Sequence, residues 1–412
     1  MKRIRTQLIA IFAAGAWALQ GCQSSKETPA PPGAPPAPPT GGSPGGRESA
    51  LDENHELAEP LNLKNLTVWA LLAKEIAELG EFLSLKEAQD RGVAVIGEMG
   101  SGTATPSSPV TASSGQAHGS APAQARPGAQ ADRVNALRIE NKGDLPILIC
   151  AGTVVKGGNQ DRQIGEDLVI APRTSVPVGA FCIEAHRWTP SREGSQTLGL
   201  FKCQEVVTAS QVRYSAQYFG DQNSVWKSVD HLNSVAGKSP STATFLATIE
   251  ETDKEAIAVR EELRAAVASY FKDLRAKGKA PVGFAYAVNG KPIGVRAFAH
   301  PRLFEGQLEF FVKAMCMEAD LAQREARANG KEAPSAPASS KDIVEMVQRI
   351  NREEEKVSST PGANRNGFRR SSFGGNSNCY LEIPRTREAS PGRLEKALVP
   401  ITRDWTATAK EE

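Results

Sequence analysis

The stretch VGFAYAVNGKPIGVRAFA, residues 282–299, contains the strongest local fold signal of the chain. Asn289-Gly290 lies between two alternating runs, and this dipeptide favours a two-residue type I′ turn. Counting outward from the turn predicts three facing pairs with all six side chains on one face: Tyr286–Ile293, Phe284–Val295 and Val282–Ala297. The stretch therefore predicts an antiparallel hairpin with one apolar face.

A long helix is predicted directly after this hairpin, over Arg302–Asn329. Its apolar residues recur at helical spacing, which predicts a stripe that covers the hairpin: Phe304, Leu308, Phe311, Met315 and Ala319. Other strands are expected at Leu63–Ala70, Val93–Glu98, Ala136–Asn141, Pro146–Val155, Glu166–Ala171, Ser175–Glu184 and Asn378–Pro384. Other helices are expected at Leu83–Gly92, with Ser84 as N-cap, and at Ser210–Gln217, Asn223–Ala236 and Asp253–Ala276. The fold class is α+β, with an antiparallel β-rich core covered by helices.

The first residues are typical of a targeting segment. A basic start, Lys2 to Arg5, precedes an apolar run at Leu8–Leu19, which is shorter than the ~20 residues that span a bilayer. Leu19-Gln20-Gly21-Cys22 resembles the bacterial lipobox. We therefore expect a signal peptide over residues 1–21 and lipidation at Cys22. An ordinary secretory peptide with a chance cysteine is the alternative.

The predicted lipid anchor places the chain in the cell envelope. In enteric bacteria, an aspartate directly after the lipidated cysteine retains lipoproteins at the inner membrane. This chain has Gln23 at that position, so the periplasmic face of the outer membrane is favoured. Three of the 49 basic residues lie in residues 1–21, which leaves 46 against 47 acidic residues. No nucleic acid is expected as a partner of a nearly neutral chain. The expected partners are the membrane, through Cys22, and an anionic small molecule or cell-envelope component.

Low-complexity segments divide the chain. Residues 22–54 are rich in Pro, Gly and Ser and predict an extended tether, and one α+β domain is expected over 61–385. Residues 99–132 predict a disordered insertion, with a domain boundary there as the alternative. Residues 330–341 and 357–378 are expected to be loose, and residues 386–412 to form a tail.

The cysteines indicate neither a metal site nor a complete set of disulfides. Five remain after Cys22, an odd number, and none has metal-ligand spacing, so no metal and no cofactor are expected. Cys150, Cys182 and Cys316 lie in apolar runs typical of core positions. Cys182 with Cys203 is the disulfide pair to test first.

Two segments carry the residues suited to chemistry, Gly152–Arg162 and Phe181–Trp188. The backbone N–H groups of a Gly157-Gly158 turn can bind an anion, and Arg162 can add a planar guanidinium. Glu184 at a strand end can act as a general base. Candidate ligand-binding residues are Gly157, Gly158, Gln160, Arg162, Glu184, Arg187 and Trp188. In the structural alternative, the glycines form only a turn and Glu184 pairs with an arginine.

Together these segments resemble the ARG-and-Rhodanese-Phosphatase-superfamily-associated protein domain. The matching positions are Ala151, Gly152, Val154, Val155, Gly157, Gly158, Gln160, Arg162, Cys182, Glu184, Arg187 and Trp188. Weaker similarities are an early NLTV strand at Asn65–Val68 and the hairpin at Gly290–Phe298. The resemblance covers roughly residues 61–325 and at most extends to 385. It implies a family of unknown function, whose name records genomic associations and establishes no activity.

Two functions follow as hypotheses. The first is a membrane-anchored periplasmic lipoprotein with a binding or scaffolding domain of unknown ligand. The alternative is a hydrolase acting on nucleotide or sugar-phosphate groups, and whether the chain is an enzyme stays open. The hydrolase requires Glu184, Arg162 and Arg187 to converge in a concave pocket near Gly157-Gly158. Side chains buried as closed ion pairs would argue against it.

Overall fold

The computed structural model describes residues 49–99, 136–192, 194–331, 336–356, 368–373, 376–390 and 393–407. The expected signal peptide and Cys22 lie outside these ranges, as do most of the expected tether, nearly all of the insertion at 99–132 and residues 357–367. Within the described ranges, no helix combines the length and apolar character that a bilayer crossing requires.

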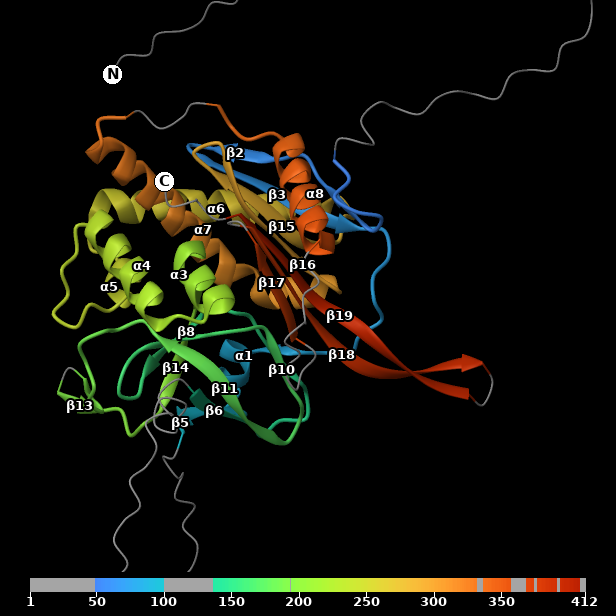
Figure 1. The fold of residues 1–412 in the computed structure, drawn as a ribbon, viewed down its shortest axis with the longest axis horizontal. Coiled ribbons are helices and arrows are strands. Elements are labelled where there is room, and N and C mark those ends of the chain that lie inside the picture. The colour runs from blue at the N-terminus through green and yellow to red at the C-terminus, as the bar shows by residue number, and fades with distance from the viewer. Residues whose placement is uncertain are drawn as a thin grey trace, which may run out of the picture. The chain divides into compact units, whose positions relative to one another are not determined.

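The largest sheet has the order β1-β3-β15-β16-β19-β18-β17, with β2 paired to β3, and all its pairings are antiparallel (Figure 1). Its strands are β1 His55–Leu57, β2 Leu61–Leu63, β3 Leu66–Ala73, β15 Pro281–Val288, β16 Lys291–Phe298, β17 Phe368–Phe373, β18 Asn376–Ser390 and β19 Arg393–Ala407. The sheet thus joins strands from both ends of the domain, and the predicted hairpin β15–β16 lies in its middle.

The hairpin turn forms where predicted, but the facing pairs do not. Asn289 and Gly290 have φ values of 51° and 71° and connect Val288 to its partner Lys291. A β-bulge then shifts the register by one residue, giving the pairs Tyr286–Gly294, Ala285–Val295 and Gly283–Ala297. The extra residue is Ile293, next to Pro292, which has no N–H to donate to the ladder.

The expectation of a single apolar face on this hairpin is also wrong, because the sheet is buried on both faces. Phe284 and Tyr286 belong to the main core, whereas Val282, Val295 and Ala297 belong to a second apolar cluster. When both faces are buried, alternation no longer shows which side chains share a face.

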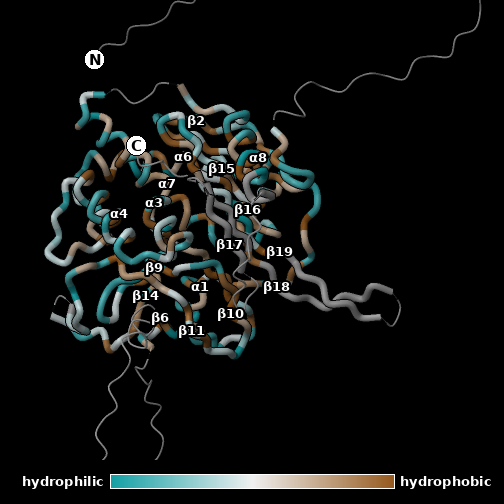
Figure 2. Tube along the Cα trace, in the orientation of Figure 1, coloured by the Kyte–Doolittle hydropathy of each residue, from teal (hydrophilic) through white to brown (hydrophobic). Residues whose placement is uncertain are grey.

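Two long helices cover the main-core face of this sheet: α6 Lys254–Ala276 and α7 Pro301–Ala328. Phe304 and Phe311 of α7 pack their rings against Phe284, with centroids 6.3 and 5.2 Å apart. On the other face, α8 (Ser340–Lys356) buries Ile343, Val347 and Ile350 in the second cluster. Hydrophobic residues gather where these elements meet (Figure 2). The predicted helix over Arg302–Asn329 is therefore confirmed, together with the α+β class.

A second sheet has the order β14-β8-β9-β11-β6-β5. Its strands are β5 Ala94–Glu98, β6 Ala136–Asn141, β8 Thr153–Gly157, β9 Arg162–Ile164, β11 Thr174–Cys182 and β14 Phe201–Val207. A bridge between Gly97 and Leu200 joins its two edge strands, so the sheet curls towards closure. Because β5 pairs with β6, both flanks of the insertion belong to one sheet, which argues against a domain boundary there.

Shorter elements complete the fold. A three-stranded sheet contains β4 Leu83–Ser84, β7 Ile147–Ile149 and β10 Leu168–Ile170, and the hairpin β12 Ser191–Arg192 and β13 Ser195–Gln196 follows β11. The predicted strand Pro146–Val155 is broken by a turn at Gly152, whose φ is 83°. Helices are α1 Leu85–Asp90, α3 Ser210–Tyr214, a π-helix Ser215–Phe219, α4 Gln222–Val235 and α5 Leu246–Ile249. Ser84 caps α1 as predicted, accepting the Glu87 N–H at 3.2 Å.

Several expected boundaries are wrong. Leu51, placed in the tether, is buried in the second cluster beside Leu57, so the domain begins before residue 55. Residues 368–373 were expected to be loose but form β17. Residues 393–407 were expected in a tail but form β19, and β16 pairs with it at Thr402–Thr406. The β16–β19 pairing joins residues about 100 positions apart, and local sequence patterns do not reveal such distant partners.

Candidate functional site

The two segments singled out in the sequence lie side by side. Gly152–Arg162 supplies β8, a glycine-rich turn and the start of β9, and Phe181–Trp188 ends β11. Because β9 pairs with β11, Arg162 is the register partner of Cys182. Strand pairing therefore brings the two segments together.

The Gly157-Gly158 turn requires glycine at both positions. Both residues have positive φ, 144° and 46°. A Cβ on Gly157 would overlap the carbonyl oxygen of Leu200, and one on Gly158 would overlap the ring of Phe201. The glycines therefore permit close contact between this turn and the start of β14.

The N–H groups of this turn already bind acceptors of the protein itself. Gly157 donates to Asp161 Oδ1 at 3.1 Å, Gly158 to the Leu200 carbonyl at 3.0 Å and Asn159 to Glu98 Oε1 at 2.9 Å. Two of these three acceptors are carboxylates. The anion-binding arrangement expected at the turn thus exists, but Asp161 and Glu98 supply the negative charge.

Glu184 and Arg187 form a closed, buried pair. Their side chains are 1% and 6% exposed, and Arg187 Nη2 lies 2.8 Å from Glu184 Oε2. Arg187 also donates to the carbonyls of Gly157, Gly158 and Thr189 at 2.8–3.1 Å. The Arg187 guanidinium thereby ties the end of β11 to the glycine turn.

Burial alone would raise the pKa of the Glu184 carboxyl, but hydrogen bonds outweigh this effect and lower it. The donors are the Arg187 side chain, the Asp161 N–H at 3.0 Å and the Thr242 hydroxyl. Glu184 is therefore held as a carboxylate. An acceptor with this many internal donors is poorly suited to take a proton from a substrate.

Arg162 and Gln160 are also buried within the protein. Arg162 is 0% exposed and contacts Cys182 Sγ at 2.8 Å and Glu98 Oε2 at 3.7 Å. Gln160 is 4% exposed and donates to the Ala185 carbonyl at 3.3 Å. Like Glu184 and Arg187, these two side chains contact neighbouring segments of the protein and are shielded from solvent.

Trp188 differs from every other candidate because it is 56% exposed. Its ring lies over the buried Arg162 guanidinium, 5.7 Å from ring centroid to Cζ. Leu198 and Leu200, which follow the β12–β13 hairpin, are 76% and 43% exposed. We call Trp188, Leu198 and Leu200 the Trp188 surface.

The hairpin between these residues is fastened to the glycine turn. The Thr197 N–H donates to the Pro190 carbonyl at 2.7 Å, and the Thr197 hydroxyl donates to the Gly158 carbonyl at 3.1 Å. Arg187 donates to the same Gly158 carbonyl. The residues that precede Trp188 and Leu198 in the chain are therefore hydrogen-bonded to the same carbonyl group.

Cys182 and Cys203, the pair singled out for a first disulfide test, are not bonded to each other, and both thiols are free and buried. Cys182 lies on β11 and Cys203 on β14, with β8 and β9 between them in the sheet. Three inter-strand steps of about 4.8 Å far exceed the roughly 7 Å limit between disulfide-bonded Cα atoms. Burial raises the pKa of the Cys203 thiol to about 12, so it is not a reactive thiolate.

Comparison with known proteins identifies one family. The model of the ARG and Rhodanese-Phosphatase-superfamily-associated Protein domain, ARPP-1, matches residues 54–372. The chain belongs to this family. No curated protein and no solved structure matches it. The ARPP-1 match includes both motif segments and ends at β17, so β18 and β19 extend the sheet beyond the matched region.

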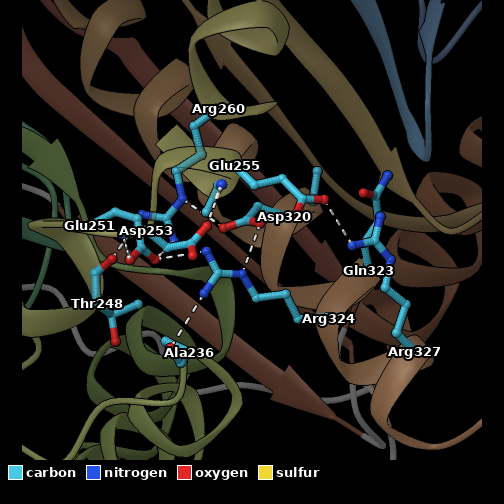
Figure 3. Close-up of polar contacts among 12 residues, drawn as sticks. Ala236, Thr248, Glu251, Asp253, Glu255, Arg260, Asp320, Gln323, Arg324 and Arg327 are labelled. Atoms are coloured by element: carbon cyan, nitrogen blue, oxygen red, sulfur yellow. Dashed lines mark hydrogen bonds and ion pairs between the residues drawn. The ribbon is translucent and has the colours of Figure 1, made fainter. Parts of the chain in front are cut away.

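A second polar region of this ARPP-1 domain was not predicted from the sequence. Glu251 and Asp320 are buried beside Arg260 and Arg324, between α6, α7 and the end of α5 (Figure 3). Arg324 joins the two carboxylates, with Nη2 2.8 Å from Glu251 and Nε 3.0 Å from Asp320. Lys238 lies 2.9 Å from Glu251. We call these five residues the Glu251 cluster. The sequence indicated only the two helices, α6 and α7, that carry Arg260, Asp320 and Arg324.

A third polar region joins the largest sheet to Asp167, the residue before β10, and to the π-helix. Arg296 of β16 pairs with Asp167, which also accepts a hydrogen bond from Thr402 at 2.5 Å. Asp404 lies 3.7 Å from Arg296 and accepts a hydrogen bond from Tyr218 of the π-helix at 3.1 Å. All these side chains are buried. They connect β16 and β19 of the largest sheet to the residue before β10 and to the π-helix.

Proposed function

We propose that this protein is a lipid-anchored binding module of the periplasm, and that its ligand contacts the Trp188 surface. The observation that supports this proposal is the contrast within one motif. Glu184 and Arg187 are almost fully buried, whereas the adjacent Trp188 is 56% exposed. A tryptophan that mainly served the core would be covered.

The physical properties of this surface suit binding. Exposed aromatic and aliphatic side chains lose water favourably when a partner covers them, at about 25 cal/mol per Å². Tryptophan is enriched among the residues that dominate binding energies. The hydrogen bonds from Arg187 and Thr197 to Gly158 limit movement of the supporting backbone, which lowers the entropic cost of binding.

A hydrolase is the weaker hypothesis. It needs Glu184, Arg162 and Arg187 to face a pocket, and these side chains are 1%, 0% and 6% exposed. A groove of about 430 Å³ does lie beside the glycine turn, but none of the three lines it. The arrangement therefore supports binding better than hydrolysis.

The anchor is proposed from the sequence. Cys22 follows a basic start and an apolar run in lipobox order, and Gln23 favours the outer membrane. Labelled palmitate should be incorporated by the native chain and not by Cys22→Ser, with fractionation following the label. Equal labelling of both chains would overturn the anchor without affecting the Trp188 surface.

A thermal-shift screen against nucleotides, sugars and cell-wall fragments tests the binding proposal. At least one compound should raise the melting temperature of the native chain, and Trp188→Ala should remove that shift. Ile257→Ala is a matched control, because Ile257 is 41% exposed on α6. If every shift survives in Trp188→Ala, or the native chain responds to no compound, the proposal is wrong.

A further inference from the structure

Two lysines face each other across adjacent strands of the curled sheet. Lys156 on β8 and Lys202 on β14 are register partners in an antiparallel pair. Partners in such a pair have Cβ atoms only about 5 Å apart, and like charges at this position destabilise the sheet. The like-charge pair therefore lowers the stability of the sheet, and the fold alone gives no reason for keeping it.

Neighbouring acidic groups compensate this pair only in part. Lys156 Nζ lies 3.0 Å from Glu250 Oε1, and that glutamate side chain is 58% exposed at the end of α5. Lys202 is exposed, and it makes no ion pair with any residue that the structure describes. One of two adjacent ammonium groups thus remains without an opposite charge.

The two lysines line a common groove. It has a volume of about 430 Å³ and is lined by Lys156, Gly157, Ser195, Gln196, Thr197, Leu200, Phe201 and Lys202. Besides the two ammonium groups, the lining offers the Ser195 hydroxyl and the Gln196 amide of the β12–β13 hairpin, whereas the Thr197 hydroxyl and N–H already donate to Gly158 and Pro190. Leu200 also belongs to the Trp188 surface, so the groove and that surface adjoin.

This lining favours a phosphate monoester over a carboxylate. A phosphate monoester carries about −1.5 to −2 charges at pH 7 and three strong acceptor oxygens. Lys202 supplies one ammonium group and Lys156 a second that it shares with Glu250, while the Ser195 hydroxyl and the Gln196 amide can donate to the remaining oxygens. A carboxylate has only two acceptor oxygens and would leave more of these donors without a partner.

We propose that the groove between β8 and β14 binds the phosphate group of a small phosphorylated molecule through Lys156 and Lys202. The remainder of such a molecule would lie towards Leu200. This site goes beyond the proposed function, since it uses neither Trp188 nor the lipid anchor.

Calorimetric titration of the full chain in detergent, at low ionic strength, tests the site with inorganic phosphate and glycerol phosphate as probes. Both should bind saturably to the native chain. Lys202→Gln should weaken binding about tenfold, the value of one lost hydrogen bond to a charged group. Tighter binding of glycerol phosphate identifies an ester as the ligand, and equal binding identifies free phosphate; either supports the site.

Glu250→Gln gives an effect in the opposite direction. Removing this carboxylate frees Lys156, so phosphate should bind several-fold more tightly. Two matched controls separate this from a general charge effect: Lys272→Gln, an exposed lysine of α6, and Glu262→Gln, an α6 glutamate that is 52% exposed and paired with Lys64. Both should leave the affinity unchanged.

Three outcomes would overturn the site. They are the absence of saturable binding by the native chain, an unchanged affinity in Lys202→Gln, and equal losses in Lys202→Gln and Lys272→Gln. Trp188→Ala should retain phosphate binding, so a failure of the Trp188 surface and a failure of this groove are distinguishable.

Discussion

The Glu251 cluster and the Lys156–Lys202 groove are both charged regions, but their charges are arranged differently. In the cluster, Arg324 lies within 3.0 Å of both Glu251 and Asp320, so opposite charges alternate (Figure 3). In the groove, two lysines face each other, and among the described residues one carboxylate, that of Glu250, forms an ion pair with them. The first arrangement stabilises the folded chain, whereas the second leaves positive charge available to a ligand.

The largest effect is expected when the cluster is broken. Glu251→Gln leaves the half-buried Arg260 and Arg324 with one buried carboxylate, that of Asp320, between them. Removing one partner of a buried ion pair costs about 3–5 kcal/mol, so the free energy of unfolding should fall by about 3 kcal/mol. Urea unfolding measures this change. A loss below about 1 kcal/mol would mean that the cluster is not a stabilising element.

A loss of stability is also expected on acidification of the native chain. Burial raises the pKa of Glu251, but the Asp253 N–H, Lys238, the Thr252 N–H and Arg324 lower it to about 2 from the usual 4.5. A depressed pKa contributes stability that is complete above pH 4.5 and is lost as the pH falls towards 2. Unfolding measured across this range should show the loss, and Glu251→Gln should show a shallower one. Parallel curves for the two chains would contradict this assignment.

The smallest effect has the opposite sign. Lys202→Glu replaces a like-charge pair with an opposite-charge pair across β8 and β14. Cross-strand pairs of opposite charge contribute about 0.2–1 kcal/mol, so the variant should unfold at slightly higher urea concentration. It should also lose phosphate binding. A destabilised variant would show that Lys202 has a structural role and would remove the contrast with the cluster.

The sequence predicted local features well. The Asn289-Gly290 turn, the Ser84 cap and the long helix α7 depend on neighbouring residues, and all three form. The resemblance of two segments to one family is also confirmed. These predictions rest on short-range geometry or on a motif spanning few elements.

Features that depend on distant partners were missed. The bulge at Ile293 lies next to Pro292, which the sequence shows. The register that results also depends on how β15 pairs with β16 and with β3. No strand was predicted at Phe201–Val207, where the pairing is irregular and Glu205 has a φ of 53°. The burial of Glu184 and Arg187 was left open, because a motif gives residue types without their exposure.

Urea unfolding of Arg187→Ala and Trp188→Ala, compared directly, tests the central claim that the motif has a buried supporting part and an exposed binding part. Arg187 is 6% exposed and pairs with Glu184, so its variant should lose about 3–5 kcal/mol. Trp188 is 56% exposed, and its variant should lose less than about 1 kcal/mol. Equal losses in the two variants would contradict the claim, because Trp188 would then also serve the fold.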